Sequence, residues 1–178
     1  ISTTAKVQAS GTAGNPITLR FENGARFSKP AWGVGALSSS AIYISRKNYI
    51  VIDGGANGII ECTNNGSSAA TTPAGSFGIQ QNAEGVYLDT CDNCEVKNLT
   101  IRNIYQRVPN SNDSNAHGRG VVVINSNNAR VYNNTISNAY FGIYAYASSA
   151  NKENLNIYEN DISRISTGIV TALAGAVN

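Results

Sequence analysis

The sequence has little charge and no long apolar run. Lys, Arg, Asp and Glu make up 13% of the 178 residues, about half of the usual share, and the net charge is +2. The basic residues are scattered, so the electrostatic footprint of a nucleic-acid-binding protein is missing. No apolar stretch approaches the roughly 18 to 20 residues that span a bilayer. We therefore expect no nucleic-acid partner and no membrane span.

Methionine is absent, and the first residues resemble neither a charged leader nor a signal core. We expect the chain to be a processed product or an excised piece of something longer. The hydrophobic content of 42%, spread over short runs of Ile, Val, Leu and Tyr, excludes disorder and is enough for a core. We therefore expect residues 1–178 to form a single domain that is part of a longer solenoid, a structure built from stacked repeats.

Cysteine is scarce, with three residues: Cys62, Cys91 and Cys94. An odd number this small does not indicate a disulfide framework. The spacing of Cys91 and Cys94 is that of a metal knuckle or a redox pair, but no second such pair follows and His117 is the single histidine. We favour small thiols packed at a corner of the chain, with Cys62 one coil away. No metal ligand set is predicted.

Glycine and asparagine are abundant, and the sequence repeats. Four segments begin with Gly and continue with β-branched or aromatic residues: Gly85–Asp89, Gly120–Ile124, Gly142–Tyr146 and Gly168–Ala172. A polar corner and a second short strand follow the first three, at Val96–Ile101, Val131–Ile136 and Ile157–Ile162. An earlier pair of segments, Ala41–Ser45 and Ile50–Gly55, has the same layout.

The period of the repeat is about 22 to 26 residues, and it is longer where loops are inserted at about 63–84 and 105–119. A leucine-rich repeat would show L-x-x-L-x-L in each unit, and an immunoglobulin-like sandwich would need hairpin turns. Each unit here restarts in the same direction after a corner, as parallel stacking requires. The pattern predicts an all-β fold, a parallel β-helix with Asn-rich corners.

The physics of stacking explains the composition. Equivalent side chains of successive coils lie about 4.8 Å apart, so like charges repel whereas amides can hydrogen-bond along the stack. Corners need positive φ angles, which Gly and Asn adopt at least cost. We therefore expect ladders of Asn and stacks of Ile and Val.

Three motifs together resemble the pectate-lyase-like superfamily, which includes polysaccharide lyases and phage tailspikes. They are the opening Ser10–Arg20, the segment Ile50–Gly55 and the N-x-I coils. The resemblance covers most of the chain and implies a right-handed β-helix that acts on or binds carbohydrate. The signature motifs of the polygalacturonase relatives are missing, so no catalytic residue of the superfamily is carried over to this sequence.

The inserted loop at 105–119 holds the densest mix of titratable groups in the sequence. Long loops on a rigid scaffold often carry function, so we consider its residues as candidates. Its candidates for catalysis are Arg107, Asp113, His117 and Arg119. His117 could serve as a general base, and the arginines could bind a sugar carboxylate. The alternative is a solvated loop with an incidental histidine, and the sequence favours it. Ca²⁺ would be needed only by a lyase, and no other cofactor is evident.

Tyrosines in or beside strands offer a second candidate site. Tyr132 and Tyr158 align in successive coils beside Val131 and Ile157, so alternation places both rings outside, where they could receive sugar rings. Tyr105 is a third candidate for glycan contact.

Two hypotheses remain open. The first is an extracellular or surface-exposed β-helix that binds or cleaves a polysaccharide or cell-surface glycan. The second is a structural shaft of a filament, adhesin or tailspike that assembles through open coil ends.

Overall fold

The computed structural model describes residues 1–30, 32, 40–63, 83–104, 118–147 and 154–172. These residues form twelve strands and no helix, which confirms the all-β prediction. The strands are β1 (Ala5–Lys6), β2 (Ile17–Arg20), β3 (Arg26–Lys29), β4 (Ile42–Ser45), β5 (Ile50–Cys62), β6 (Glu84–Asp89), β7 (Glu95–Arg102), β8 (Arg119–Ile124), β9 (Arg130–Tyr132), β10 (Thr135–Tyr146), β11 (Asn156–Tyr158) and β12 (Asp161–Ala172).

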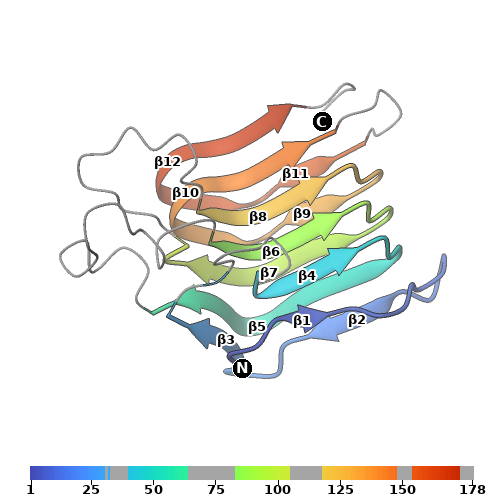
Figure 1. Cartoon of the computed structure of the whole chain (residues 1–178), viewed down its shortest axis with the longest axis horizontal. Helices are drawn as coiled ribbons and strands as arrows, with labels where there is room; N and C mark the ends of the chain where they lie inside the picture. Colours follow the sequence, from blue (N-terminus) through green and yellow to red (C-terminus); the bar gives the residue numbers. More distant parts are fainter. Residues whose placement is uncertain (31, 33–39, 64–82, 105–117, 148–153, 173–178) are drawn as a thin grey trace, which may run out of the picture.

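The twelve strands belong to one hydrogen-bonded network in which every strand pairing is parallel (Figure 1). They stack in three rows. Row one contains β1, β4, β6, β8 and the second halves of β10 and β12. Row two contains β2, β9, β11 and the first halves of β5 and β7, and row three contains β3 and the remaining halves.

The long strands bend from one row into the next. The first half of β5 pairs with β2 and its second half with β3. In the same way, β10 pairs with β7 over Thr135–Ser137 and with β8 over Phe141–Tyr146. Parallel strands cannot be joined by a tight hairpin, so each partner strand is reached only after the chain has passed through the other rows.

The register confirms the alignment predicted from the repeats. Val86 lies opposite Val121, Val121 opposite Ile143, and Ile143 opposite Ile169, each one residue after an aligned glycine. The second set is confirmed as well, because Val131 lies opposite both Val96 and Ile157. The inward positions of these columns form one continuous core.

The glycines that open the first three of the four aligned repeats have a packing role. A Cβ atom on Gly120 would lie 2.6 Å from the carbonyl oxygen of Gly142 and 2.6 Å from Cγ2 of Ile136. These distances are shorter than any real Cβ contact, so only glycine fits. Gly85 and Gly142 are crowded in the same way, by Ile101 and Ile162, whereas Gly168 in β12 is not.

Positive φ angles mark the corners. Thirteen of the described residues other than glycine have them, and the register places all thirteen in four columns of stacked corner residues. Eight of the thirteen are asparagines, as the composition led us to expect. The columns are Arg46, Thr90 and Asn125; Tyr49, Asn93, Asn128 and Asn154; Asn98, Asn133 and Glu159; and Asn103, Asn138 and Arg164.

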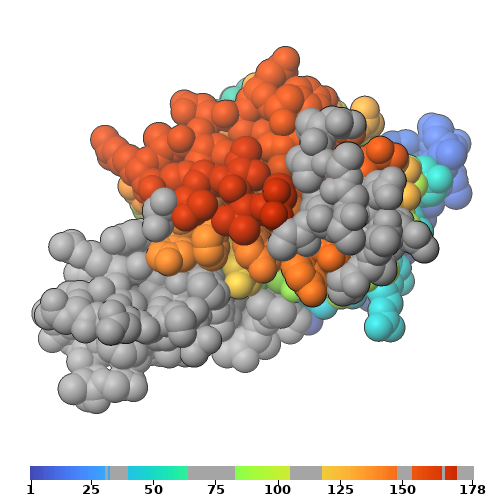
Figure 2. Space-filling view, turned by 90° about the horizontal axis from the view of Figure 1, so that it is seen from above, coloured from blue at the N-terminus to red at the C-terminus, as the bar shows by residue number. Residues whose placement is uncertain are grey.

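The predicted insertions lie largely outside the described residues. The insertions were predicted to end at about residues 84 and 119. In the structure these two residues already belong to strands, because β6 begins at Glu84 and β8 begins at Arg119. Viewed from above in Figure 2, the red and orange atoms of β12 and β10 form much of the visible surface at that end of the stack. Within the described ranges, no helix is long or apolar enough to cross a bilayer.

Candidate functional site

The outer face of row two carries acidic, basic, amide and aromatic side chains. Side chains alternate along each strand, so the residues on either side of the buried column Ile52, Val96 and Val131 point outward. The first outward column is Val51, Glu95, Arg130 and Asn156, and the second is Arg20, Asp53, Lys97, Tyr132 and Tyr158.

Two tyrosines form an aromatic stack in the second column. The rings of Tyr132 and Tyr158 are nearly parallel, at 6°, with centroids 4.8 Å apart. Their alignment follows from the direct register between β9 and β11. Tyr158 still exposes 41% of its surface, so the stack is accessible from solvent.

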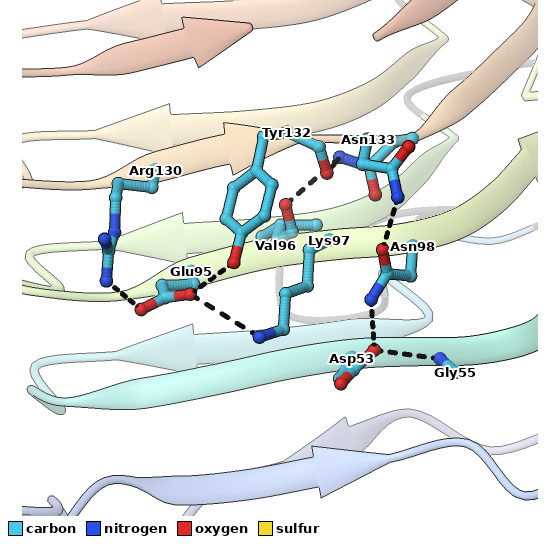
Figure 3. Close-up of polar contacts among 10 residues, drawn as sticks. Asp53, Gly55, Glu95, Val96, Lys97, Asn98, Arg130, Tyr132 and Asn133 are labelled. Carbon is cyan, nitrogen blue, oxygen red and sulfur yellow. Dashed lines mark hydrogen bonds and ion pairs between the residues drawn. The ribbon is translucent and has the colours of Figure 1, made fainter. Parts of the chain in front are cut away.

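Glu95 holds the stack in place (Figure 3). The Tyr132 hydroxyl donates to Glu95 Oε2 at 2.9 Å, and Lys97 Nζ lies 3.8 Å from the same oxygen. The Arg130 guanidinium donates to the other carboxylate oxygen, Oε1. The Lys97 ammonium also lies 5.8 Å from the centre of the Tyr132 ring, within the range of a cation–π contact. One carboxylate thus fixes an aromatic ring and two cations.

The protonation states of this network are stabilised by its own contacts. Partial burial raises the pKa of the Tyr132 hydroxyl, and its hydrogen bond to Glu95 adds to that rise. Burial disfavours the charge on Lys97, but hydrogen bonding to Tyr132 and the charges of Glu95 and Asp53 outweigh it and raise the pKa of Lys97. A neutral tyrosine and a charged lysine therefore persist at neutral pH.

Asp53 ends a chain of amides on the same face. Its Oδ1 accepts hydrogen bonds from the Asn98 side chain at 2.7 Å and from the Gly55 backbone at 2.9 Å. Asn133 in turn donates to Asn98 at 2.6 Å (Figure 3). Burial disfavours the carboxylate, but these hydrogen bonds and the Lys97 charge outweigh it and lower the pKa of Asp53.

A groove of about 470 Å³ runs beside these columns. It is lined by the corner residues Tyr49, Asn93 and Asn128 and by the charged residues Glu95 and Arg130. The groove crosses several coils, so it extends along the stack. Its remaining lining residues are Thr12, Ala13, Gly14, Pro16, Val51 and Asn156.

The structure describes some of the site residues predicted from the sequence and not others. Tyr132 and Tyr158 are brought together on row two, whereas Tyr105, Arg107, Asp113 and His117 lie outside the described residues.

Arg119 lies in row one, away from this face. Its Nη1 is 3.0 Å from Oε1 of Glu84, and its guanidinium lies 4.7 Å from the centre of the Tyr144 ring. Glu84 has no exposed surface, and burial raises its pKa to about 7 despite the nearby charge of Arg119. Arg119 is therefore the partner of a buried carboxyl group in row one.

Sequence reasoning missed Glu95, Lys97 and Arg130. Their signal was the alternation around Val96 and Val131, which places the flanking residues of both strands outside. Among the described residues, no group of three or more His, Cys, Asp or Glu side chains could hold a metal ion.

Comparisons with known proteins find structural similarity at low sequence identity. No protein-family profile and no curated protein matches the chain. A solved structure from Parabacteroides merdae, provisionally named a glycosyl hydrolase, is similar over 94% of this chain and 76% of its own, with 14% identity and a TM-score of 0.43.

Proposed function

We propose that this chain is a right-handed parallel β-helix of the pectate-lyase-like type that binds polysaccharide on the outer face of row two, outside the cell or on a cell or virion surface. The observation that carries the proposal is the solvent-accessible stack of Tyr132 and Tyr158 beside a groove lined by amides and charges. Aromatic surface beside a few fixed polar groups is what a site for an amphipathic ligand such as a sugar requires.

The chemistry of the face supports recognition of sugar hydroxyls. Asn93, Asn128 and Asn156 bring amide donors and acceptors to the groove, and Arg130 adds a guanidinium. Successive coils repeat these groups at about 4.8 Å, so consecutive sugar units of an extended chain would meet similar surroundings. A polymer that lies along the stack would therefore gain contacts from each coil.

The same face supports binding better than cleavage. Asp53 and Glu95 lie on neighbouring strands, two residues apart in register, which corresponds to about 8 Å between their Cα atoms. A glycoside hydrolase that used this pair of carboxyl groups would need one of them protonated at working pH. Asp53 has a lowered pKa, and Glu95 already accepts from Tyr132 and Arg130. We therefore expect a bound glycan to stay intact.

Affinity electrophoresis against a set of neutral and acidic polysaccharides, with and without Ca²⁺, tests the proposal. Tyr158→Ala should abolish the retardation that the wild-type chain shows in the best gel. Tyr146→Ala is the matched control, because Tyr146 exposes a similar 40% of its surface and lies on row one. Equal binding by both variants, or no binding to any polysaccharide, would contradict the proposal, and release of reducing ends or unsaturated uronides would show cleavage instead.

A structural role through self-assembly is the second candidate. Among the described strands, β12 pairs only with β10, and Ile169 on it exposes 47% of its surface. An exposed strand edge with apolar side chains favours pairing with another chain. Light scattering over a concentration series tests this role: growth of the particle mass supports it, and a constant monomer mass contradicts it.

A further inference from the structure

The corner between β6 and β7 contains two buried cysteines. Cys91 and Cys94 flank a turn formed by Asp92 and Asn93, and neither cysteine has any exposed surface. Asn93 has a φ of 57°, so the turn reverses sharply at this residue. The two thiols are therefore separated by a single tight turn.

Both thiols point to the same place, the corner of the neighbouring coil. The Cys91 thiol donates to the carbonyl oxygen of Ile44 at 3.3 Å, and the Cys94 thiol donates to that of Lys47 at 3.5 Å. These two carbonyls are three residues apart, where the chain leads from β4 to β5. The two side chains consequently lie next to each other in the core.

The thiols also interact directly. A hydrogen bond between them, together with burial, raises the pKa of Cys91, and the same hydrogen bond lowers the pKa of Cys94. Cys94 is thus the sulfur that more readily carries negative charge, and a thiolate is the form that attacks a disulfide.

We propose that Cys91 and Cys94 form a disulfide bond under oxidising conditions. Residues at the two ends of a β-turn have Cα atoms within about 7 Å, and disulfides join Cα atoms about 4.4 to 6.8 Å apart. The bond therefore requires a rotation of the side chains and no rearrangement of the coil.

The chemistry balances with a low-molecular-weight disulfide as the oxidant. The Cys94 thiolate attacks it, breaks its sulfur–sulfur bond and releases one small thiolate, which leaves a mixed disulfide on Cys94. Cys91 loses its proton and attacks the Cys94 sulfur, which releases the second small thiolate. Two electrons pass to the oxidant, and the two released thiolates take up the two protons. Because the folded corner is buried, we expect this step to occur before the core closes around it.

Cys62 is excluded from the pair by its place in the fold. It ends the second half of β5, in row three, and burial raises its pKa to about 12. The odd number of cysteines is thus compatible with one disulfide and one free thiol.

The bond would fix one side of the groove. Asn93, which lies between the two cysteines, lines the groove, and Asp92 is tied to the coils on both sides. Its backbone N–H donates to Asn48 at 2.9 Å, and its carboxylate accepts from the backbone of Asn127 at 2.8 Å. A disulfide here would keep three stacked corners in register.

Intact-mass spectrometry after alkylation tests the inference. The full chain is refolded with a mixture of oxidised and reduced glutathione, unfolded without reductant in N-ethylmaleimide and weighed, with a fully reduced sample as reference. The expected result is one adduct and a disulfide-linked peptide that contains Cys91 and Cys94, against three adducts after reduction.

Two variants make the assignment. Cys62→Ala should give no adduct in the oxidised sample, whereas Cys94→Ala should give two. Three adducts on the oxidised wild-type chain, or a disulfide that involves Cys62, would overturn the inference. Peptide mapping of the wild-type chain decides the question even if a variant fails to fold.

Discussion

Tyr132 lies face to face with Tyr158, and its hydroxyl donates to Glu95 of the coil beneath. Three successive strands, β7, β9 and β11, therefore contribute to one ordered patch. Long exposed side chains normally lose conformational entropy when they bind a ligand. Here the fold itself has already restricted the Tyr132 ring, which is a favourable arrangement for a binding surface.

Removing only the hydroxyl of Tyr132 tests this preorganisation. Tyr132→Phe keeps the ring and its stacking but removes the hydrogen bond to Glu95. We expect a loss of about 0.5 to 1.5 kcal/mol in the free energy of unfolding and a several-fold weaker affinity for the glycan that the wild-type chain binds. Urea unfolding and titration calorimetry measure the two effects. An unchanged affinity alongside the expected loss of stability would show that the hydroxyl serves the fold alone.

The buried Asn134 stabilises the stack through several coils. Its side chain accepts from the Leu99 backbone at 3.1 Å and donates to the carbonyl oxygens of Val96 and Tyr132 and to Asn160. Asn134→Ala leaves buried backbone groups without partners, so we expect a loss of about 2 to 4 kcal/mol in the free energy of unfolding. Asn23→Ala, in an exposed turn, is the control and should change it by about 0.5 kcal/mol or less. Equal midpoints in urea for both variants would contradict the role of Asn134.

The glycine column allows a test within one set of equivalent positions. At Gly120 an added methyl group would meet the carbonyl oxygen of Gly142 and the side chain of Ile136, both at 2.6 Å. At Gly168 the nearest heavy atom, Cδ1 of Ile165, is 3.8 Å away. We expect Gly120→Ala to lower the free energy of unfolding by about 3 kcal/mol or more, and Gly168→Ala to change it by about 1 kcal/mol or less. Thermal and urea unfolding of the two variants provide the comparison, and similar losses would refute the packing argument.

The repeats made the register of the strands predictable. The aligned glycines and the Val and Ile positions predicted which residues lie opposite each other. Equivalent positions of successive coils have the same surroundings in the core, so they hold similar residues. Ladders of Asn at the corners followed from the same reasoning, since positive φ angles and stacked amides both favour Asn.

The site was predictable only in part. The Tyr132 and Tyr158 pair repeats in sequence, so alignment found it, but Glu95 contacts Arg130 and Lys97, which belong to no repeating pattern. Likewise, Glu84 and Arg119 are separated by 35 residues and have opposite charges at equivalent positions. A contact between unlike residues across coils leaves no periodic signal, and only the register brings the two together.

The ion pair of Glu84 and Arg119 gives the last prediction, a pH dependence of stability. Burial outweighs the opposing effects of Arg119 and raises the pKa of Glu84 to about 7 from its ordinary value of 4.5. Between these two values the folded chain holds a proton that the unfolded chain has released. The contribution of Glu84 to stability is therefore fully present below pH 4.5 and is lost as the pH rises to about 7, a change of about 3 kcal/mol.

Glu84→Gln isolates this contribution, because it removes the titrating group and keeps its shape. Asp53 and Glu61 have lowered pKa values, so they act in the opposite sense and gain stability as the pH rises at the acidic end. The informative quantity is thus the difference in unfolding free energy between the wild-type chain and Glu84→Gln, measured in urea at pH 4.5 and pH 7.5. We expect that difference to shift by about 3 kcal/mol against the wild-type chain at the higher pH, and Glu22→Gln, at an exposed position, should show no such shift. A constant difference would mean that Glu84 stays ionised throughout, with the charge of Arg119 outweighing the cost of burial.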